Sequence, residues 1–465
     1  MLKKSHLMKK EPEKPAGKPM IYKKLQQLIP AMFFICPNVL SYGICFGQDT
    51  LNFKDCINIS LEKNYNIQII RNEELVSENN VTPGNAGFLP TIGAEGRISQ
   101  SVVNSEQVFF SRPDEPQIGK NARSKAVSAN AGLNWTIFDG FGMFVNYNRL
   151  KDLLEAGKLN TRMNVENLIA IIGAEYYGLM QQEQRLETFK YVMKLSRTRM
   201  LIAEERYRIG KESKLEFQQA KVDYNSDSSQ YMKQQESVFS SRIKLNNTMG
   251  IDLENYTVIR NKIKVDFELD YEQLQDQTLH NNTGLQIAAN SQQLSEEELR
   301  YLLSQLFPVI TLTAGYNYNK SESQAGFQLS RKEYGYNYGV MLSYNFFNGF
   351  EFQRQRQNAI INVRNAGLQF DMIKRQVLAD LAVTYNLYQN SLNLITLEES
   401  NLQTARENFE IAIEKFHLGT LSGLEMRDIQ RVFLDAEDRL LAAQYQAKLA
   451  EISLKQISGR ISEYL

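Results

Sequence analysis

The chain of 465 residues is poor in cysteine, histidine, proline and tryptophan, and it carries no net charge. A balance of basic and acidic side chains gives no reason to expect a nucleic-acid partner. Two of the three cysteines fall in a predicted leader, which leaves Cys56 without an intramolecular disulfide partner. None of the three histidines has a Cys, Asp or Ser partner at a catalytic or metal-binding spacing, and no Gly-rich phosphate loop is present. We therefore expect no enzyme, no cofactor and no metal site.

Long apolar runs are also absent beyond the N-terminal region. Residues 1–47 are predicted to be a leader whose signal peptide begins at Met20, with Lys23 and Lys24 as its basic region and residues 28–46 as its apolar stretch. After this leader, no run approaches the roughly 20 apolar residues of a membrane-spanning helix. Insertion in a membrane would therefore have to use strands. The alternative is a cytosolic start with an uncleaved anchor.

The chain is rich in internal repetition. Pro90 recurs as Pro308 at an offset of 218 residues, and Gly250 recurs as Gly459 at an offset of 209. The second offset also relates Phe138, Asp139, Gly140 and Phe141 to Phe347, Asn348, Gly349 and Phe350. A duplication of this length predicts two copies of one unit. We expect a first repeat at residues 48–250, a connector at 251–270, a second repeat at 271–459 and a short tail at 460–465.

Each repeat begins with a helix and contains one predicted β-hairpin, over about residues 91–138 and 309–347. Residues 127–137 alternate without exception between apolar side chains and small or polar ones. Strands of around 10 residues with this alternation are typical of a transmembrane β-barrel, although a sheet half buried on a soluble core alternates in the same way. Four strands cannot close a barrel, since single-chain barrels start at about 8, so several chains would have to complete it. Residues 101–125 and 320–333 are predicted to be the hairpin loops.

Each repeat also contains a helical hairpin, predicted over about residues 141–249 and 350–458. Large apolar residues recur every seven positions in the second hairpin, at Leu381, Tyr388, Ile395, Leu402, Phe409 and Phe416. The first hairpin has Ile172, Leu179, Leu186, Met193, Met200 and Tyr207 at the matching positions. Sustained heptads predict coiled-coil packing. The first long helix, roughly residues 143–208, would be about 100 Å long at 1.5 Å per residue.

Proline, glycine and capping residues mark the predicted joints. Pro90 and Pro308 stand where a helical segment passes into a strand, a place where a missing N–H does least harm. Asp139 and Asn348 are expected to cap the long helices, with the turn supplied by Gly140 and Gly349. Gly210 and Gly419 are expected to end those helices, and Ser213 and Ser422 to start the returning ones. Alternation from Ile263 to Phe267 predicts a small strand in the connector.

This order of elements resembles the TolC-type outer-membrane efflux proteins over about residues 51–459, with Phe-Leu-Pro entering the first strand and Phe-Asp-Gly-Phe leaving the second. The resemblance implies a mixed α and β membrane protein, a homotrimer whose twelve-stranded β-barrel takes four strands from each chain. A long α-helical coiled-coil barrel would continue it across the periplasm of a Gram-negative bacterium. The implied partners are outer-membrane lipid, a periplasmic adaptor protein and an inner-membrane pump. The hairpin loops would lie outside the cell.

By the same resemblance, the two helix turns at residues 206–215 and 415–424 face the adaptor. The residues that match the family's turn pattern are Tyr207, Gly210, Ser213 and Leu215 in the first turn and Phe416, Gly419, Ser422 and Leu424 in the second. A tight helical turn that simply needs glycine is the plainer interpretation, and the two interpretations are compatible.

Glu425 and Asp428 follow the second turn and lie three residues apart, on one helical face. The resemblance places them at an acidic constriction of the tunnel entrance, where a trimer would gather six carboxylates and attract cations. An ordinary solvated face, with Arg427 in an ion pair, is the alternative. Some family members latch the closed entrance with a tyrosine and an arginine, but this chain has Phe416 and Leu421 there, which argues against a latch of that type.

Three functions remain open at this point. The leading hypothesis is a passive outer-membrane channel-tunnel of a tripartite efflux pump that exports small molecules. The second is the outer-membrane channel of a type I protein secretion system, and nothing in the sequence separates the two cargoes. The third is a periplasmic coiled-coil scaffold with no pore, against which the two-faced strands argue.

Overall fold

A computed structural model describes residues 50–465 apart from 256, 260–262 and 325–327, so the predicted leader lies outside the described residues. The short helices are α1 (Phe53–Lys63), α2 (Tyr65–Asn80), α3 (Pro83–Ala86), α6 (Tyr271–Asn281) and α7 (Thr283–Ser304). The strands are β1 (Thr91–Phe109), β2 (Arg112–Phe138), β3 (Val309–Ser323) and β4 (Ser330–Ser343). The long helices are α4 (Gly142–Arg208) and α8 (Glu351–His417), which return as α5 (Lys214–Met249) and α9 (Gly423–Ile457). A 3-10 helix, η1 (Ile461–Tyr464), follows.

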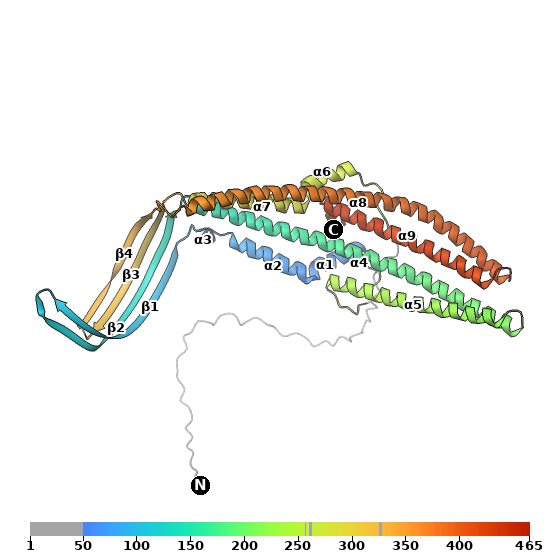
Figure 1. Cartoon of the computed structure of the whole chain (residues 1–465), viewed down its shortest axis with the longest axis horizontal. Helices are drawn as coiled ribbons and strands as arrows, with labels where there is room; N and C mark the ends of the chain where they lie inside the picture. Colours follow the sequence, from blue (N-terminus) through green and yellow to red (C-terminus); the bar gives the residue numbers. More distant parts are fainter. Residues whose placement is uncertain (1–49, 256, 260–262, 325–327) are drawn as a thin grey trace, which may run out of the picture. The chain divides into compact units, whose positions relative to one another are not determined.

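The four strands form one antiparallel sheet in the order β1-β2-β3-β4, with β1 and β4 at its edges (Figure 1). The register places like residues side by side. Ala131 pairs with Ala94 on one side and with Tyr316 on the other. The Asn317 amide donates to the Asn337 side-chain oxygen at 2.7 Å across β3 and β4. The predicted alternation is therefore confirmed, and the sheet has an apolar, aromatic face and a polar face lined by small and amide side chains.

The predicted hairpin loops are wrong in extent. β1 and β2 run on to Phe109 and Arg112, so residues 101–125 are almost entirely strand, and β3 and β4 take up residues 320–323 and 330–333 of the second predicted loop. Polar residues between 104 and 121 hide the alternation, but backbone hydrogen bonds across the ladder do not require it. β4 ends at Ser343 and not near 347, because Ser343 pairs with Val309 and the preceding Pro308 has no N–H for the ladder.

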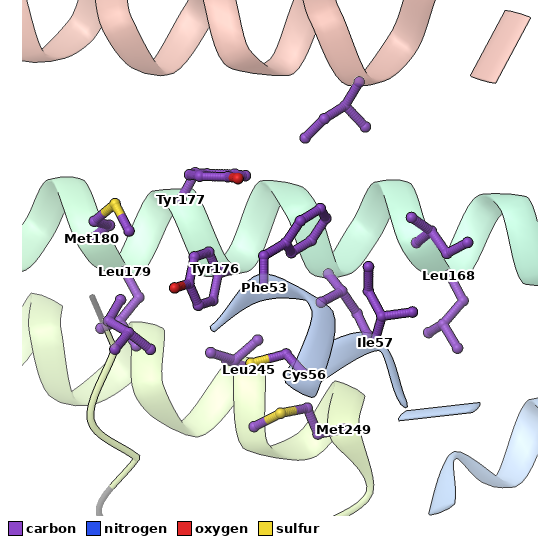
Figure 2. Packing of buried hydrophobic residues seen from close by; sticks show 14 of the residues in the cluster. Phe53, Cys56, Ile57, Leu168, Tyr176, Tyr177, Leu179, Met180, Leu245 and Met249 are labelled. Atoms are coloured by element: carbon purple, nitrogen blue, oxygen red, sulfur yellow. The ribbon is translucent and has the colours of Figure 1, made fainter. Parts of the chain in front are cut away.

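Two of the three apolar clusters in the described residues hold the long helices in pairs, and the third packs α8 on α9 around Phe409, Phe416 and Phe433. The first joins α1, α4 and α5, and Figure 2 labels Phe53, Cys56, Ile57, Leu168, Tyr176, Tyr177, Leu179, Met180, Leu245 and Met249. Cys56 is fully buried in it, as an apolar packing residue. The second cluster joins α8 and α9 around Leu381, Tyr388 and Leu454, all fully buried. Each pair of helices therefore has its own seam.

The heptad prediction is confirmed in the second pair and only partly in the first. In α8 the predicted seam residues are buried apart from Leu402, which packs partly buried beside them. In α4 the seam leaves the predicted positions toward the turn, where Val192, Ser196, Arg199 and Ala203 are buried and Tyr207 is 39% exposed. A straight helix drifts by about 20° per heptad from a strict seven-residue repeat. The drift moves the buried stripe onto residues that include charged ones.

The C-terminal end of each helical hairpin contacts a junction between two short helices, α1 and α2 in one case and α6 and α7 in the other. Asn64 caps α2, and its amide donates to Thr248 O at 2.8 Å. Asn282 caps α7, and its amide donates to Ile457 O at 2.9 Å. These contacts join pairs of residues that the two sequence offsets relate, so both repeats place the same bond at the same joint.

Glycine is required at the same two joints. Gly250 and Gly459 have φ angles of 68° and 71°, in the left-handed region. A Cβ atom at Gly250 would lie 2.7 Å from Lys63 O, and one at Gly459 would lie 2.6 Å from Asn281 O. Both the backbone conformation and the close approach therefore exclude a side chain.

The predicted strand at residues 263–267 is wrong. No strand is present in the described part of the connector, apart from an isolated bridge between Leu51 and Ile259. The amide of Asp266 instead donates to Glu451 Oε2 at 2.9 Å, and its carbonyl accepts from the Tyr388 hydroxyl. Side chains of α8 and α9 thus satisfy backbone groups that a partner strand would otherwise have to satisfy.

Candidate functional site: the helix turns and their charged surroundings

The joints between strands and long helices use glycine but not the predicted caps. Gly140 and Gly349 have positive φ, and a Cβ at Gly140 would lie 2.2 Å from Ser304 O. The N-cap positions are Phe141 and Phe350, both left-handed and without a side-chain cap bond. The prediction that Asp139 caps α4 is therefore wrong, whereas the Asn348 side chain does accept from the Phe352 amide in the first turn of α8, at 3.5 Å. Two successive left-handed residues place each N-cap two residues after the predicted capping residue. Pro90 and Pro308 directly precede β1 and β3, as predicted.

The two helix turns are built alike. At the first, the amide of Gly210 donates to Tyr207 O at 3.0 Å and the amide of Lys211 to Arg206 O at 2.8 Å. At the second, Gly419 donates to Phe416 O and Thr420 to Lys415 O, both at 3.0 Å. This pair of bonds defines a Schellman ending, which places its glycine in the left-handed region. The φ angles of Gly210 and Gly419 are 75° and 77°, so the predicted ends of the long helices are confirmed.

The returning helices begin with reciprocal caps. Ser213 and Ser422 are the N-caps, and each accepts from the amide three residues later. Glu216 and Glu425 complete the capping box by accepting from the serine amides, at 2.9 and 3.0 Å. The hydrogen bonds from the Ser422 amide and hydroxyl hold the pKa of Glu425 below its ordinary value. Glu425 is therefore ionised and also has a structural role that the sequence analysis missed.

Apolar residues at the turns stand in solvent. Leu215 is 77% exposed and Leu424 is 76% exposed, one residue after the start of each returning helix. Tyr207 stacks on Phe217 with ring centroids 6.0 Å apart, whereas Phe416 is buried under Arg206, whose guanidinium lies 5.6 Å from the ring centroid. The first turn thus presents Ile209 and Leu215 outward, and the second presents Leu418 and Leu424.

Asp428 lies on the surface of α9 and pairs with Arg431 at 3.1 Å, with both side chains 71% exposed. Glu425 and Asp428 are both exposed, while Met426 and Gln430 of the same helix are buried. The predicted acidic pair therefore shares one exposed side of α9. Arg427, which lies between Glu425 and Asp428 in the sequence, pairs with Asp227 instead of with either of these carboxylates.

Arg427 joins a buried polar network that links α4, α5 and α9. Its Nη1 atom donates to both carboxylate oxygens of Asp227, at 2.6 and 2.8 Å, and Gln430 donates to the same carboxylate at 3.2 Å. The guanidinium of Arg199 lies 3.9 Å from Asp223 in the same region. Burial lowers the pKa of Arg199, an effect that the carboxylates of Asp223 and Asp227 oppose. At the positions 209 residues after Asp223 and Asp227, the chain has Val432 and Ala436.

A sequence signal for this network was present. Asp227 and Gln234 lie seven residues apart, and each stands three residues after a tyrosine, Tyr224 or Tyr231, in the spacing of the two core positions of a heptad. The second repeat has Ala436 and Ala443 at the corresponding places, and both are buried. A polar residue at a core position specifies its partner, at some cost in stability.

The two helical hairpins meet again at a small cavity. It has a volume of about 370 Å³ and lies between α4 and α9. Arg185 of α4 crosses to Asp438 of α9, with Nη2 2.6 Å from Oδ2. Burial raises the pKa of the neighbouring Glu437, while a hydrogen bond from Thr188 lowers it. Ion pairs thus bridge the hairpins at two levels along α9.

Among the described residues, no cluster of His, Cys, Asp and Glu could hold a metal ion. Over the same part of the chain, no helix is long and apolar enough to cross a membrane.

Comparison with known proteins agrees with this architecture. The model of the outer membrane efflux protein family matches residues 56–251 and 274–460. The outer membrane protein TolC of Vibrio cholerae serotype O1 is 25% identical over 193 residues, which are 41% of this chain and 44% of that protein. The match therefore spans less than half the length of that relative.

Solved structures share the fold at low sequence identity. The CmeC outer membrane channel of Campylobacter jejuni superposes with a TM-score of 0.71 at 14% identity, covering 88% of this chain and 86% of that one. The outer membrane protein VceC of Vibrio cholerae superposes with a TM-score of 0.69 at 16% identity, covering 88% and 96%.

Proposed function

Because the chain belongs to the outer membrane efflux protein family, we propose that it is the outer-membrane channel of a tripartite efflux pump and passively conducts small molecules to the exterior. It is located in the outer membrane of a Gram-negative bacterium and extends into the periplasm. Energy for export would come from an inner-membrane pump, reached through a periplasmic adaptor protein.

The observation that carries this proposal is the two-faced sheet with two open edges. An apolar, aromatic face on all four strands suits lipid, and a polar face of small and amide side chains suits a water-filled lumen. Lipid does not tolerate the unpaired backbone groups of β1 and β4. Three copies that pair β4 of one chain with β1 of the next would give a closed barrel of twelve strands. A coiled-coil scaffold without a pore would leave the apolar face unexplained.

The long helices supply the periplasmic part. α4 and α8 each have 67 residues, which corresponds to about 100 Å of helix. In the proposed trimer, six similar hairpins from two repeats per chain would line one tunnel. The matching contacts of Asn64 and Asn282 support this internal duplication.

At the far ends of the hairpins, we assign the adaptor contact to the two turns. Leu215 and Leu424 are exposed apolar side chains on turns that backbone hydrogen bonds define, which suits a protein contact. Glu425 and Asp428 are exposed beside the second turn, and six such carboxylates in a trimer would favour cations at the entrance.

The test is assembly and conduction by the detergent-extracted protein. We expect a trimer by mass measurement and stable channels after reconstitution in a planar bilayer, because a sheet with free edges cannot stand alone in lipid. A monomer that contains a closed barrel, or a trimer that conducts no ions, would overturn the proposal.

A further inference from the structure

The two β-hairpins differ greatly in length. Pairing of β2 with β3 ends at Ser124 and Ser323, and beyond it the Gln324 amide donates to Arg123 O. Residues 102–123 therefore continue as a two-stranded ribbon of β1 and β2, which no third strand of the described chain accompanies. We call this segment the ribbon. Figure 1 shows it extending past β3 and β4.

A β-bulge bends the ribbon at its base. Val103 pairs with Ala122, but Ser105 pairs with Gly119, so β2 carries one extra residue there. Asn121 has a φ angle of 53°, and the side chain of Asn104 accepts from its amide at 2.6 Å. A bulge with a left-handed residue bends a strand and strengthens its twist. The bend is therefore encoded by specific residues.

The direction of the bend follows from burial. Ala122 is the one buried residue in β1 and β2, at 5% exposure. Its position in the alternation places it on the polar face, with Ser124, Ala126 and Ser128, which are all partly buried. At the base of the ribbon, the residues of the polar face are thus shielded from solvent, and this is the inner side of the bend. The ribbon bends toward the polar face.

The ribbon is long enough to reach the axis of the proposed barrel. Seven residues separate Val103 from the tip residue Phe110, or about 23 Å at 3.3 Å per residue. Twelve strands about 4.8 Å apart and tilted by about 40° enclose a barrel with a radius of roughly 12 Å. A ribbon that bends inward therefore spans the radius, and three symmetry-related ribbons must meet.

The chemistry of the ribbon suits contact with its own copies. Phe110 at the tip is fully exposed, whereas Val108 and Ile118, each 61% exposed, continue the apolar face on the outer side of the bend. Three acidic and three basic residues leave the ribbon without net charge, so converging copies do not repel one another. Pro113 and Pro116 remove backbone donors near the tip, which disfavours addition of a foreign strand.

We propose that the three ribbons of the trimer fold over the outer mouth of the barrel and meet at Phe110, forming a constriction on the exterior side. The occupant of each apolar tip is a second copy of the same chain. This inference rests on the proposed function, because only a closed trimer brings the ribbons to one axis.

Two measurements test it. In the first, a Phe110→Cys variant of the full chain is treated with a short bis-maleimide, and we expect cross-linked dimers. The matched control is Leu329→Cys, between β3 and β4. Leu329 is 83% exposed, but it is not part of the bent ribbon. Copies at a rim of that radius would stay roughly 20 Å apart and should not react with each other. Burial raises the pKa of the Cys56 thiol to about 12, so this native cysteine does not compete.

In the second measurement, residues 104–121 are replaced by Asn-Gly, which closes a two-residue turn between the paired residues Val103 and Ala122. We expect single-channel conductance to rise by about twofold or more, because the narrowest part of the outer mouth is removed. Absence of the 110–110 cross-link, or unchanged conductance in the shortened variant, overturns the constriction and indicates ribbons that point away from the axis. If the unmodified chain forms no channel at all, the proposed function fails instead.

Discussion

Removing Arg427 should loosen the ends of the two helical hairpins more than any neighbouring surface change. Asp227 is 2% exposed and receives three hydrogen bonds, two from Arg427 and one from Gln430. Arg427→Met would leave this carboxylate buried without its main partner. Breaking a buried ion pair from one side costs about 3–5 kcal/mol. Because the Arg427 side chain is itself 28% exposed, we expect the lower end of that range.

Asp227→Asn should cost less, about 1–2 kcal/mol, because the amide keeps the shape and some of the hydrogen bonds while the partly exposed Arg427 can be hydrated. The double variant should therefore be less destabilised than the two single changes predict when added, with a coupling of about 1–2 kcal/mol. A coupling of this size indicates a direct ion pair, whereas two independent effects would add and give no coupling.

Native-state hydrogen exchange is the suitable assay, since it reports local opening of individual helices. A cost of about 3 kcal/mol should accelerate exchange by about 100-fold in the segments of α5 and α9 that carry Asp227 and Arg427. The control is Arg431→Met, one turn along α9, which breaks only the exposed pair with Asp428 and should cost less than about 1 kcal/mol. Equal acceleration in the Arg427 and Arg431 variants would refute the assignment of a special role to the buried network.

Three further outcomes follow from the turns and joints. Gly459→Ala should lower the melting temperature more than Gly210→Ala, because both residues have positive φ but only the first Cβ meets a backbone oxygen, at 2.6 Å; equal shifts in thermal unfolding would contradict the clash. Combined Gly210→Val and Gly419→Val should reduce drug resistance in a complemented deletion strain without reducing trimer yield. The control Gly423→Val, at the second turn, should leave resistance unchanged, because Gly423 has an ordinary φ and open space around it. Full resistance in the double variant would show that the turns are not functionally special. Combined Glu425→Gln and Asp428→Asn should lower cation preference and abolish block by multivalent cations in single-channel recordings. The control Glu216→Gln, which changes the equivalent cap at the other turn, should leave selectivity and block unchanged. Unaltered selectivity in the double variant would indicate that Glu425 and Asp428 belong to an ordinary solvated surface.

Much of the fold could be predicted because its signals are local and periodic. Strand alternation depends on the side-chain period of two, so the two faces of the sheet follow from residues 127–137 whatever surrounds them. The ends of the long helices follow from Gly210 and Gly419, since few other residues adopt the left-handed conformation. The returning helices begin where Ser213 and Ser422 can satisfy free amides.

The failed predictions concern contacts between distant segments. No local pattern shows that Glu451 and Tyr388 hold Asp266, so the alternation in the connector predicts a strand that does not form. The sequence of the ribbon predicts a loop, because its backbone pairing is accompanied by no alternation of side chains. Asp227 finds Arg427 two hundred residues away along the chain, and its burial depends on how α5 and α9 approach. Periodicity and turn chemistry are properties of neighbouring residues, which the sequence alone determines, whereas burial, pairing of charges and the bend of the ribbon arise only when separate elements meet in the folded chain.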